Sequence, residues 1–142
     1  MIKGINHLGI VVKSINEVTA FLGKAFGAEE ISRIESSELK QISAIVRIGN
    51  GCFELMEPTA PDGVVGKFLA SKGGGLHHVS LLCDDVVAAS KKLEAQGLQV
   101  IGKMFDGPVK AAFVHPKSAK GILFELAEKS SLDLNENPRS YR

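Results

Sequence analysis

The stretch INHLGIVV, residues 5–12, returns in outline 71 positions later as LHHVSLLC, residues 76–83. Both stretches are short and apolar, as is typical of a strand, and both have a histidine at the third position. A second match has the same offset, because FEL at residues 53–55 recurs at residues 124–126. Two matches at one offset indicate an internal duplication, which is the first feature to establish in a new sequence.

The residues between the matched stretches predict the same order of elements in each half. In the first half, residues 14–17 form a capping box before a helix that Gly27 ends. In the second half, Asp84 or Asp85 begins a helix that Gly97 ends. After each helix we expect three strands, at residues 28–36, 40–48 and 51–57 in the first half and at residues 98–104, 109–115 and 121–127 in the second.

Each half is therefore a β-α-β-β-β module, and the two modules define one α+β domain over residues 1–128. A module of this size does not bury a sufficient core alone, so we expect modules of about residues 4–58 and 75–128 to pair. Their strands are expected to form a curled mixed sheet around a metal-binding cleft. Turn-forming residues make 59–74 a linker with a short helix, and the polar residues 129–142 are expected to form an exposed tail.

The composition excludes several classes of protein. Seventeen basic and sixteen acidic residues give a net charge of +1. This argues against a protein that binds nucleic acid or a membrane surface through an excess of positive charge. No apolar run approaches the roughly 20 residues that cross a bilayer, and the first residues lack the apolar core of a signal peptide. Cys52 and Cys83 have no zinc-knuckle spacing. We expect a cytoplasmic protein with two thiols in a reducing environment.

The duplication places a histidine on the first strand and a glutamate on the last strand of each half. A lone histidine on a strand is usually structural, and a lone glutamate usually faces solvent. Here, however, each glutamate lies between Phe and Leu, so strand alternation turns its carboxylate away from the core and toward the lining of a curled sheet. A carboxylate buried there needs a partner. Two imidazoles and two carboxylates suit one divalent ion (Co, Zn, Ni or Mn) with open positions for substrate, and the four residues are His7, Glu54, His78 and Glu125.

Paired modules with this His/Glu pattern resemble the vicinal oxygen chelate superfamily, which includes glyoxalase I, extradiol dioxygenases and bleomycin-resistance proteins. Three segments narrow the resemblance to its methylmalonyl-CoA epimerase branch: ELMEP at residues 54–58, GLHH at residues 75–78 and HPKS at residues 115–118. The resemblance covers roughly residues 4–128. It implies that the metal ligands are His7, Glu54, His78 and Glu125, whereas His77 faces the other side of its strand and is structural.

The resemblance also implies an activity. An acyl-CoA thioester would chelate the metal ion through two oxygens, and a base would remove the acidic proton from the carbon beside the carbonyl. Return of a proton to the opposite face of that carbon would invert its configuration. Glu125 is the first candidate for that base, because it is a carboxylate at the edge of the metal site. A homodimer is the usual assembly in the family.

Two departures from the family lie where substrate would be handled. Several epimerases carry a second acidic residue at a position that falls near Ser43, so Gln41, Ser43 or a metal-bound water would have to relay the returning proton. The glycine-rich loop before HPKS is replaced by FDGPVK at residues 105–110. Lys110 and Lys117 are candidates for contact with CoA phosphates, although a lysine in a turn is more often simply solvated.

Two other functions remain open. A glyoxalase I-type lactoylglutathione lyase would use the same four ligands and the same proton abstraction on a hemithioacetal. A non-catalytic small-molecule binding protein of the same fold would need an aromatic cleft, for which a chain with no Trp and one Tyr is poorly equipped. A dioxygenase is disfavoured, because that chemistry uses two histidines and one carboxylate with more open positions.

Overall fold

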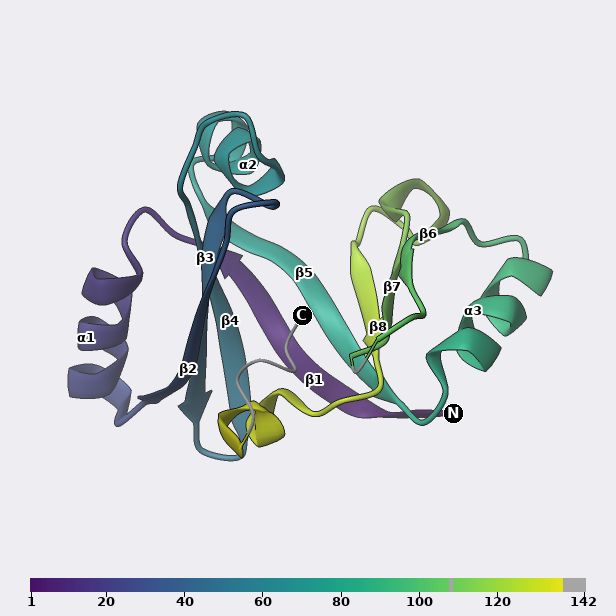
Figure 1. The fold of residues 1–142 in the computed structure, drawn as a ribbon, viewed down its shortest axis with the longest axis horizontal. Helices are drawn as coiled ribbons and strands as arrows, with labels where there is room; N and C mark the ends of the chain where they lie inside the picture. Colours follow the sequence, from purple (N-terminus) through teal and green to yellow (C-terminus); the bar gives the residue numbers. More distant parts are fainter. Residues whose placement is uncertain (108, 137–142) are drawn as a thin grey trace. The chain divides into compact units, whose positions relative to one another are not determined.

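The computed structural model of the protein describes residues 1–107 and 109–136. Its element order follows the predicted duplication, with a strand, a helix and three strands in each half and one further helix between the halves (Figure 1). The elements are β1 (Ile2–Val11), α1 (Ile15–Phe26), β2 (Glu29–Ser36), β3 (Gln41–Ile48), β4 (Gly51–Pro58), α2 (Val64–Lys72), β5 (Gly75–Cys83), α3 (Val86–Ala95), β6 (Val100–Met104), β7 (Ala111–Val114), a short 3-10 helix (Pro116–Ser118), β8 (Phe124–Ala127) and a second 3-10 helix (Ser131–Glu136).

Pairing of the strands repeats as well. Over the described residues the strands form one mixed sheet of eight, in the order β2-β3-β4-β1-β5-β8-β7-β6. The first strand of each half runs parallel to its last strand, as β1 with β4 and β5 with β8, and the remaining pairs within each half are antiparallel. The predicted α+β class and the paired β-α-β-β-β modules are therefore confirmed. By its internal contacts the chain divides into two compact units, residues 8–77 and residues 1–7 together with those from 78 onward.

The unit of residues 8–77 is built around α1. The N-terminus of α1 is capped as predicted, because the Ser14 hydroxyl accepts a hydrogen bond from the backbone N–H of Glu17 at 3.2 Å. Its C-terminus ends at Gly27, which adopts the left-handed conformation with φ of 70°. The buried face of the helix packs on one face of the sheet, in a core of Val12, Ile15, Leu22, Ala44, Val46 and Leu55.

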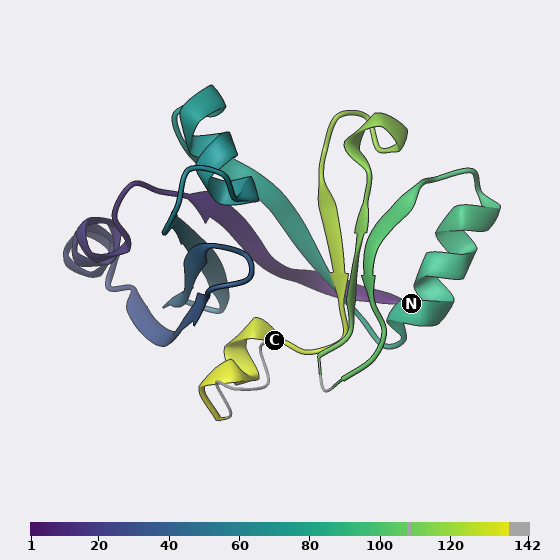
Figure 2. The same ribbon diagram turned by 45° about the horizontal axis from the view of Figure 1, so that its top comes forward.

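In the other unit, α3 packs on strands β5 to β8 (Figure 2). Asp85 is the predicted cap that the structure selects, since its carboxylate accepts from the N–H of Ala88 at 2.9 Å. The helix ends before Gly97, which has a φ of 87°. Its apolar side joins a core of Cys83, Val86, Val100, Ala112 and Leu126. The two helices therefore occupy equivalent places in the two halves.

The linker helix α2 covers the sheet face opposite to α1. Val65 packs on Val11 and Met56, which alternate with the residues that face α1. Gly66 lets the preceding linker lie close against α2, because a Cβ there would lie 2.4 Å from the carbonyl oxygen of Ala60. Within the described residues, no helix is both long and apolar enough to span a bilayer.

The structure corrects two local predictions. The last strand begins at Phe124 rather than at residue 121, because Lys120 and Gly121 have positive φ values of 60° and 87° and form a turn. The segment after β8 was expected to be exposed, but Ser131 is 1% exposed and begins a 3-10 helix. Hydrogen bonds to Asn6 and His7, far away in the sequence, account for this burial. Residues 137–142 of the predicted tail lie outside the described residues.

Candidate metal site

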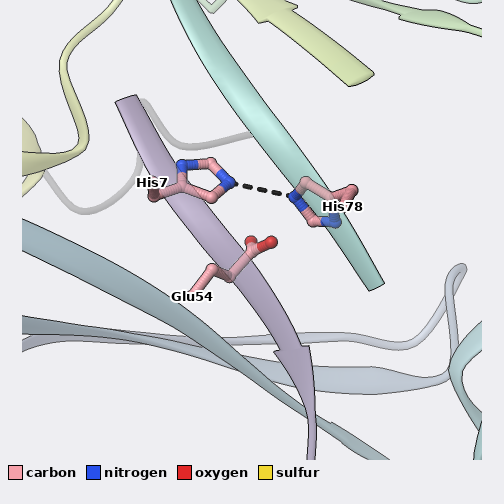
Figure 3. Close-up of side chains that lie close together, drawn as sticks. All are labelled: His7, Glu54 and His78. Carbon is pink, nitrogen blue, oxygen red and sulfur yellow. Dashed lines mark hydrogen bonds between the residues drawn. The ribbon is translucent and has the colours of Figure 1, made fainter. Parts of the chain in front are cut away.

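Three of the four predicted ligands form a cluster in the described part of the chain. One ligand atom from each of His7, Glu54 and His78 lies within 4.8 Å of the others, and all three side chains are buried (Figure 3). Strand register accounts for the approach of Glu54, because it pairs with Gly9 in the β1/β4 ladder. His7 lies two residues before Gly9 and so shares its strand face. Whether these residues bind a metal ion stays a prediction.

The two imidazoles contact each other directly. His7 Nε2 lies 3.0 Å from His78 Nε2, and the rings are nearly perpendicular with centroids 5.2 Å apart. Burial lowers the pKa of His7 to about 4. At neutral pH the ring is therefore uncharged, which is the form in which an imidazole nitrogen binds a metal ion.

Glu125 lies beside His7 but is not a member of the three-residue cluster. On β8 it pairs with Ser80 of β5, and its Oε1 is 3.5 Å from His7 Nε2. Burial raises the pKa of Glu125 to about 7, and a hydrogen bond from Ser80 acts in the opposite direction. A carboxylate with this pKa both releases and accepts a proton readily near neutral pH.

The cluster fits a divalent metal ion. Nitrogen ligands about 2.1 Å from a shared ion are themselves about 3.0 to 3.4 Å apart at octahedral or tetrahedral angles, and the two Nε2 atoms are 3.0 Å apart. Glu54 adds a buried carboxyl group to the two imidazoles. Nitrogen and oxygen ligands without a thiolate are typical of sites for Zn, Co, Ni or Mn.

Ser43 and Gln41 lie on the same sheet face as Glu54. Ile45 is the partner of Glu54 in the β3/β4 ladder, and positions 43 and 41 alternate with it on β3. Ser43 is buried, and its hydroxyl accepts a hydrogen bond from Gln41 Nε2 at 3.0 Å. Ser43 and Gln41 therefore place a hydroxyl and an amide on the sheet face that carries Glu54.

Other residues singled out in the sequence lie outside the cluster. Lys117 is exposed in the first 3-10 helix, where its backbone N–H donates to His115 Nδ1 at 3.1 Å, and Lys110 is half-buried just before β7. Their contact with a CoA moiety stays a prediction. His77 behaves as expected of a structural residue, because its ring packs edge-on against Phe68 of α2 with centroids 4.9 Å apart.

Sequence reasoning missed three polar residues that surround the ligands. Asn6 donates from Nδ2 to Ser80 Oγ at 3.4 Å and accepts at Oδ1 from the N–H of Ser131 at 2.8 Å. The Ser131 hydroxyl lies 2.7 Å from His7 Nδ1. Asn6 and Ser80 had a weak signal, since each lies within two residues of a predicted histidine ligand. Ser131 had none, because 124 positions separate it from His7.

The chain belongs to the glyoxalase/bleomycin resistance protein/dioxygenase superfamily, whose family model matches residues 6–113. Within it, human mitochondrial methylmalonyl-CoA epimerase is 30% identical over 130 residues, which are 87% of this chain and 73% of the human protein. An uncharacterized protein of Bacillus subtilis, YqjC, is 32% identical over 137 residues, 94% of this chain and 97% of the relative.

The fold is likewise that of a solved epimerase. A variant of Streptomyces coelicolor methylmalonyl-CoA epimerase, in complex with 2-nitronate-propionyl-CoA, superimposes with a TM-score of 0.84 at 27% identity. The match covers 92% of this chain and 100% of the Streptomyces coelicolor chain. The human relative and the solved Streptomyces coelicolor structure are thus both methylmalonyl-CoA epimerases.

Proposed function

We propose that the protein is a metal-dependent epimerase that acts on methylmalonyl-CoA or a closely similar acyl-CoA thioester. The observation that carries the proposal is the pair of buried, neighbouring imidazoles with Glu54 beside them and Glu125 3.5 Å from His7. The epimerase relatives support the choice of substrate, since they share both the fold and most of the length of this chain. The carbon to be inverted lies between a thioester and a carboxylate, which makes its proton acidic.

His7, His78 and Glu54 would hold the metal ion, with Glu125 as the fourth candidate ligand. When bound, a divalent ion draws electron density from carbonyl oxygens of the substrate, which makes the neighbouring C–H more acidic. The protein contributes a buried setting, in which such a charge acts more strongly than it does in water. Metal analysis of the purified protein identifies the native ion among Zn, Co, Ni and Mn.

Glu125 is the proposed base. Burial raises the pKa of Glu125 to about 7 in the metal-free protein, and a bound divalent cation would lower it again, which keeps the carboxylate ionised and able to accept a proton. The proton must return to the opposite face of the carbon to invert it. Ser43 and Gln41 supply a hydrogen-bonded hydroxyl and amide on the face of Glu54, and they are the proposed relay.

Deuterium exchange tests the proposal directly. Purified protein, loaded with Co²⁺ or Zn²⁺, is incubated with racemic methylmalonyl-CoA in D₂O, and the signal of the proton between the two carbonyls is followed by NMR. We expect this signal to disappear faster than in the metal-free sample, and a single enantiomer to racemise at a comparable rate. Absence of any protein-dependent exchange would falsify proton abstraction from this substrate.

The two alternative functions give different results in parallel assays. A glyoxalase I-type enzyme would convert methylglyoxal and glutathione to a thioester, and would leave methylmalonyl-CoA unchanged. A binding protein would retain a small ligand equally well with and without a chelator, and would catalyse neither reaction. Either result would replace the epimerase proposal.

A homodimer and a cytoplasmic location are parts of the same proposal. The family resemblance supports the dimer, and the two thiols, both buried, suit a reducing compartment. Analytical ultracentrifugation is expected to give twice the mass of the 15.1 kDa chain. Cell fractionation tests the location, and recovery of the protein outside the cytoplasmic fraction would contradict it.

A further inference from the structure

We infer that Ser131 is a positioning residue of the metal site, whose hydroxyl holds His7 with its proton on Nδ1 and its lone pair on Nε2. The inference rests on the proposed metal function and adds a residue from beyond the last strand. Ser131 is 1% exposed, and its Oγ lies 2.7 Å from His7 Nδ1. This hydroxyl is thus within short hydrogen-bond distance of the ring nitrogen that faces away from the cluster.

The chemistry of a neutral imidazole gives this contact its consequence. Such a ring carries one proton, and a metal ion binds the nitrogen that lacks it. His7 Nε2 is the nitrogen that faces His78, at 3.0 Å. When Ser131 Oγ accepts a hydrogen bond from Nδ1–H, the proton stays on Nδ1 and Nε2 keeps its lone pair for the ion. Histidine ligands of metals generally donate their second N–H in this way.

Ser131 also acts through its backbone. Its N–H donates to Asn6 Oδ1 at 2.8 Å, and Asn6 Nδ2 donates in turn to Ser80 Oγ at 3.4 Å. Ser80 is fully buried and donates to Glu125, the proposed base. A single residue after β8 therefore contacts a proposed metal ligand through its side chain and is connected to the proposed base by a chain of three hydrogen bonds. The segment expected to be an exposed tail is part of the site.

The test compares Ser131→Ala and Ser131→Thr with Ser130→Ala as matched control. Ser130 is the neighbouring residue, and its hydroxyl accepts only from the N–H of Leu132 among the hydrogen bonds described for it. The affinity for Co²⁺ is measured by competition with a chromophoric chelator. We expect Ser131→Ala to bind Co²⁺ about 10- to 100-fold more weakly, as is typical when the partner of a histidine ligand is lost. Ser131→Thr should restore binding, and Ser130→Ala should match the wild type.

A second measurement needs no metal ion. Nitrogen-15 chemical shifts of the His7 ring in the metal-free protein report which nitrogen carries the proton. We expect a protonated Nδ1 in the wild type and in Ser130→Ala, and a larger fraction protonated at Nε2 in Ser131→Ala. Circular dichroism verifies that each variant is folded. If Ser131→Ala does not fold, Ser131→Cys replaces it, because it preserves the volume with a weaker acceptor.

The outcomes separate this inference from the proposed function. Unchanged Co²⁺ affinity together with an unchanged proton position in Ser131→Ala would overturn the inference and leave the metal site standing. A wild type that binds no divalent ion would remove the proposed metal function, and the ring-nitrogen shifts would still decide whether Ser131 sets the proton position of His7.

Discussion

At the scale of single residues, the partly buried carboxylate of Glu125 has the most direct link to the proposed chemistry. Replacing it by Gln keeps the shape of the side chain and removes the proton acceptor. We expect proton exchange on methylmalonyl-CoA to slow by about 10²- to 10⁴-fold, the usual contribution of a general base. Glu128→Gln, three residues further along the chain, is the matched control and should retain the rate. Equal rates for Glu125→Gln and the wild type would assign the base to another residue.

Folding shifts the pKa values of Glu125 and His7 in opposite directions, and each shift makes the free energy of unfolding depend on pH in its own way. The pKa of Glu125 rises from 4.5 to about 7 on folding, so its contribution to stability is present below pH 4.5 and is lost as the pH rises through 7. The pKa of His7 falls from 6.5 to about 4, so its contribution is present above pH 6.5 and is lost as the pH falls through 4.

These directions predict the pH dependence of a difference between two proteins. In the presence of a chelator, the free energy of unfolding of Glu125→Gln should increase relative to that of the wild type between pH 5 and pH 8. The reason is that only the wild type must bury a carboxylate charge that forms as the pH rises. Denaturant titrations at several pH values measure this difference, in which the effect of His7 largely cancels. A difference that does not change with pH would contradict the raised pKa of Glu125.

At the scale of elements, β5 carries two adjacent histidines with different surroundings. His78 belongs to the metal cluster, whereas the ring of His77 packs on Phe68 of α2. We expect His78→Ala to lower the affinity for Co²⁺ strongly and His77→Ala to leave it within a few-fold of the wild type. His77→Ala should instead lower the melting temperature, since it removes packing from α2. Titration calorimetry and thermal unfolding distinguish the two effects, and comparable Co²⁺ affinities would remove His78 from the site.

The close contact between α2 and the linker before it depends on the absence of a side chain at Gly66. An added Cβ would meet the Ala60 carbonyl oxygen at 2.4 Å and backbone atoms of Pro61 at 2.9 Å, and backbone atoms cannot move aside cheaply. We expect Gly66→Ala to destabilise the protein by about 1–3 kcal/mol, the usual cost of overpacking. Gly51→Ala is the control, because its nearest contact would be the Ile48 carbonyl oxygen at 4.0 Å. Equal unfolding midpoints for the two variants would show that α2 adapts.

At the scale of the whole molecule, a metal ion that binds only the folded chain must stabilise it. Linkage predicts a gain in unfolding free energy of about 2.7 kcal/mol when the free ion is at 100 times its Kd. Thermal unfolding with and without Co²⁺ measures the gain, and a chelator should reverse it. The Glu54→Gln variant, which weakens one proposed ligand, should gain less. An equal gain in this variant would place the bound ion elsewhere on the protein.

Much of the architecture was predictable because its signals are local. Ser14 and Gly27 predicted the two ends of α1, since helix caps depend on neighbouring backbone groups. The offset of 71 residues pairs His7 with His78 and Glu54 with Glu125 in the sequence alone. The sequence did not predict that β8 begins only at Phe124. Apolar residues continue from 122 onward, and the positive φ values of Lys120 and Gly121 that form the preceding turn are visible only in the structure.

The amino-acid sequence by itself determined the duplication, the order of the elements, and the residue types that would meet at a metal ion. These follow from strand periodicity, helix capping and a fixed repeat, all of which are properties of the chain read along its length. Tertiary structure alone decided that Glu125 is buried enough to have a pKa of about 7, and that Ser131 lies against His7. Desolvation and hydrogen bonds between residues 124 positions apart arise only when distant segments pack together, and no local pattern encodes them.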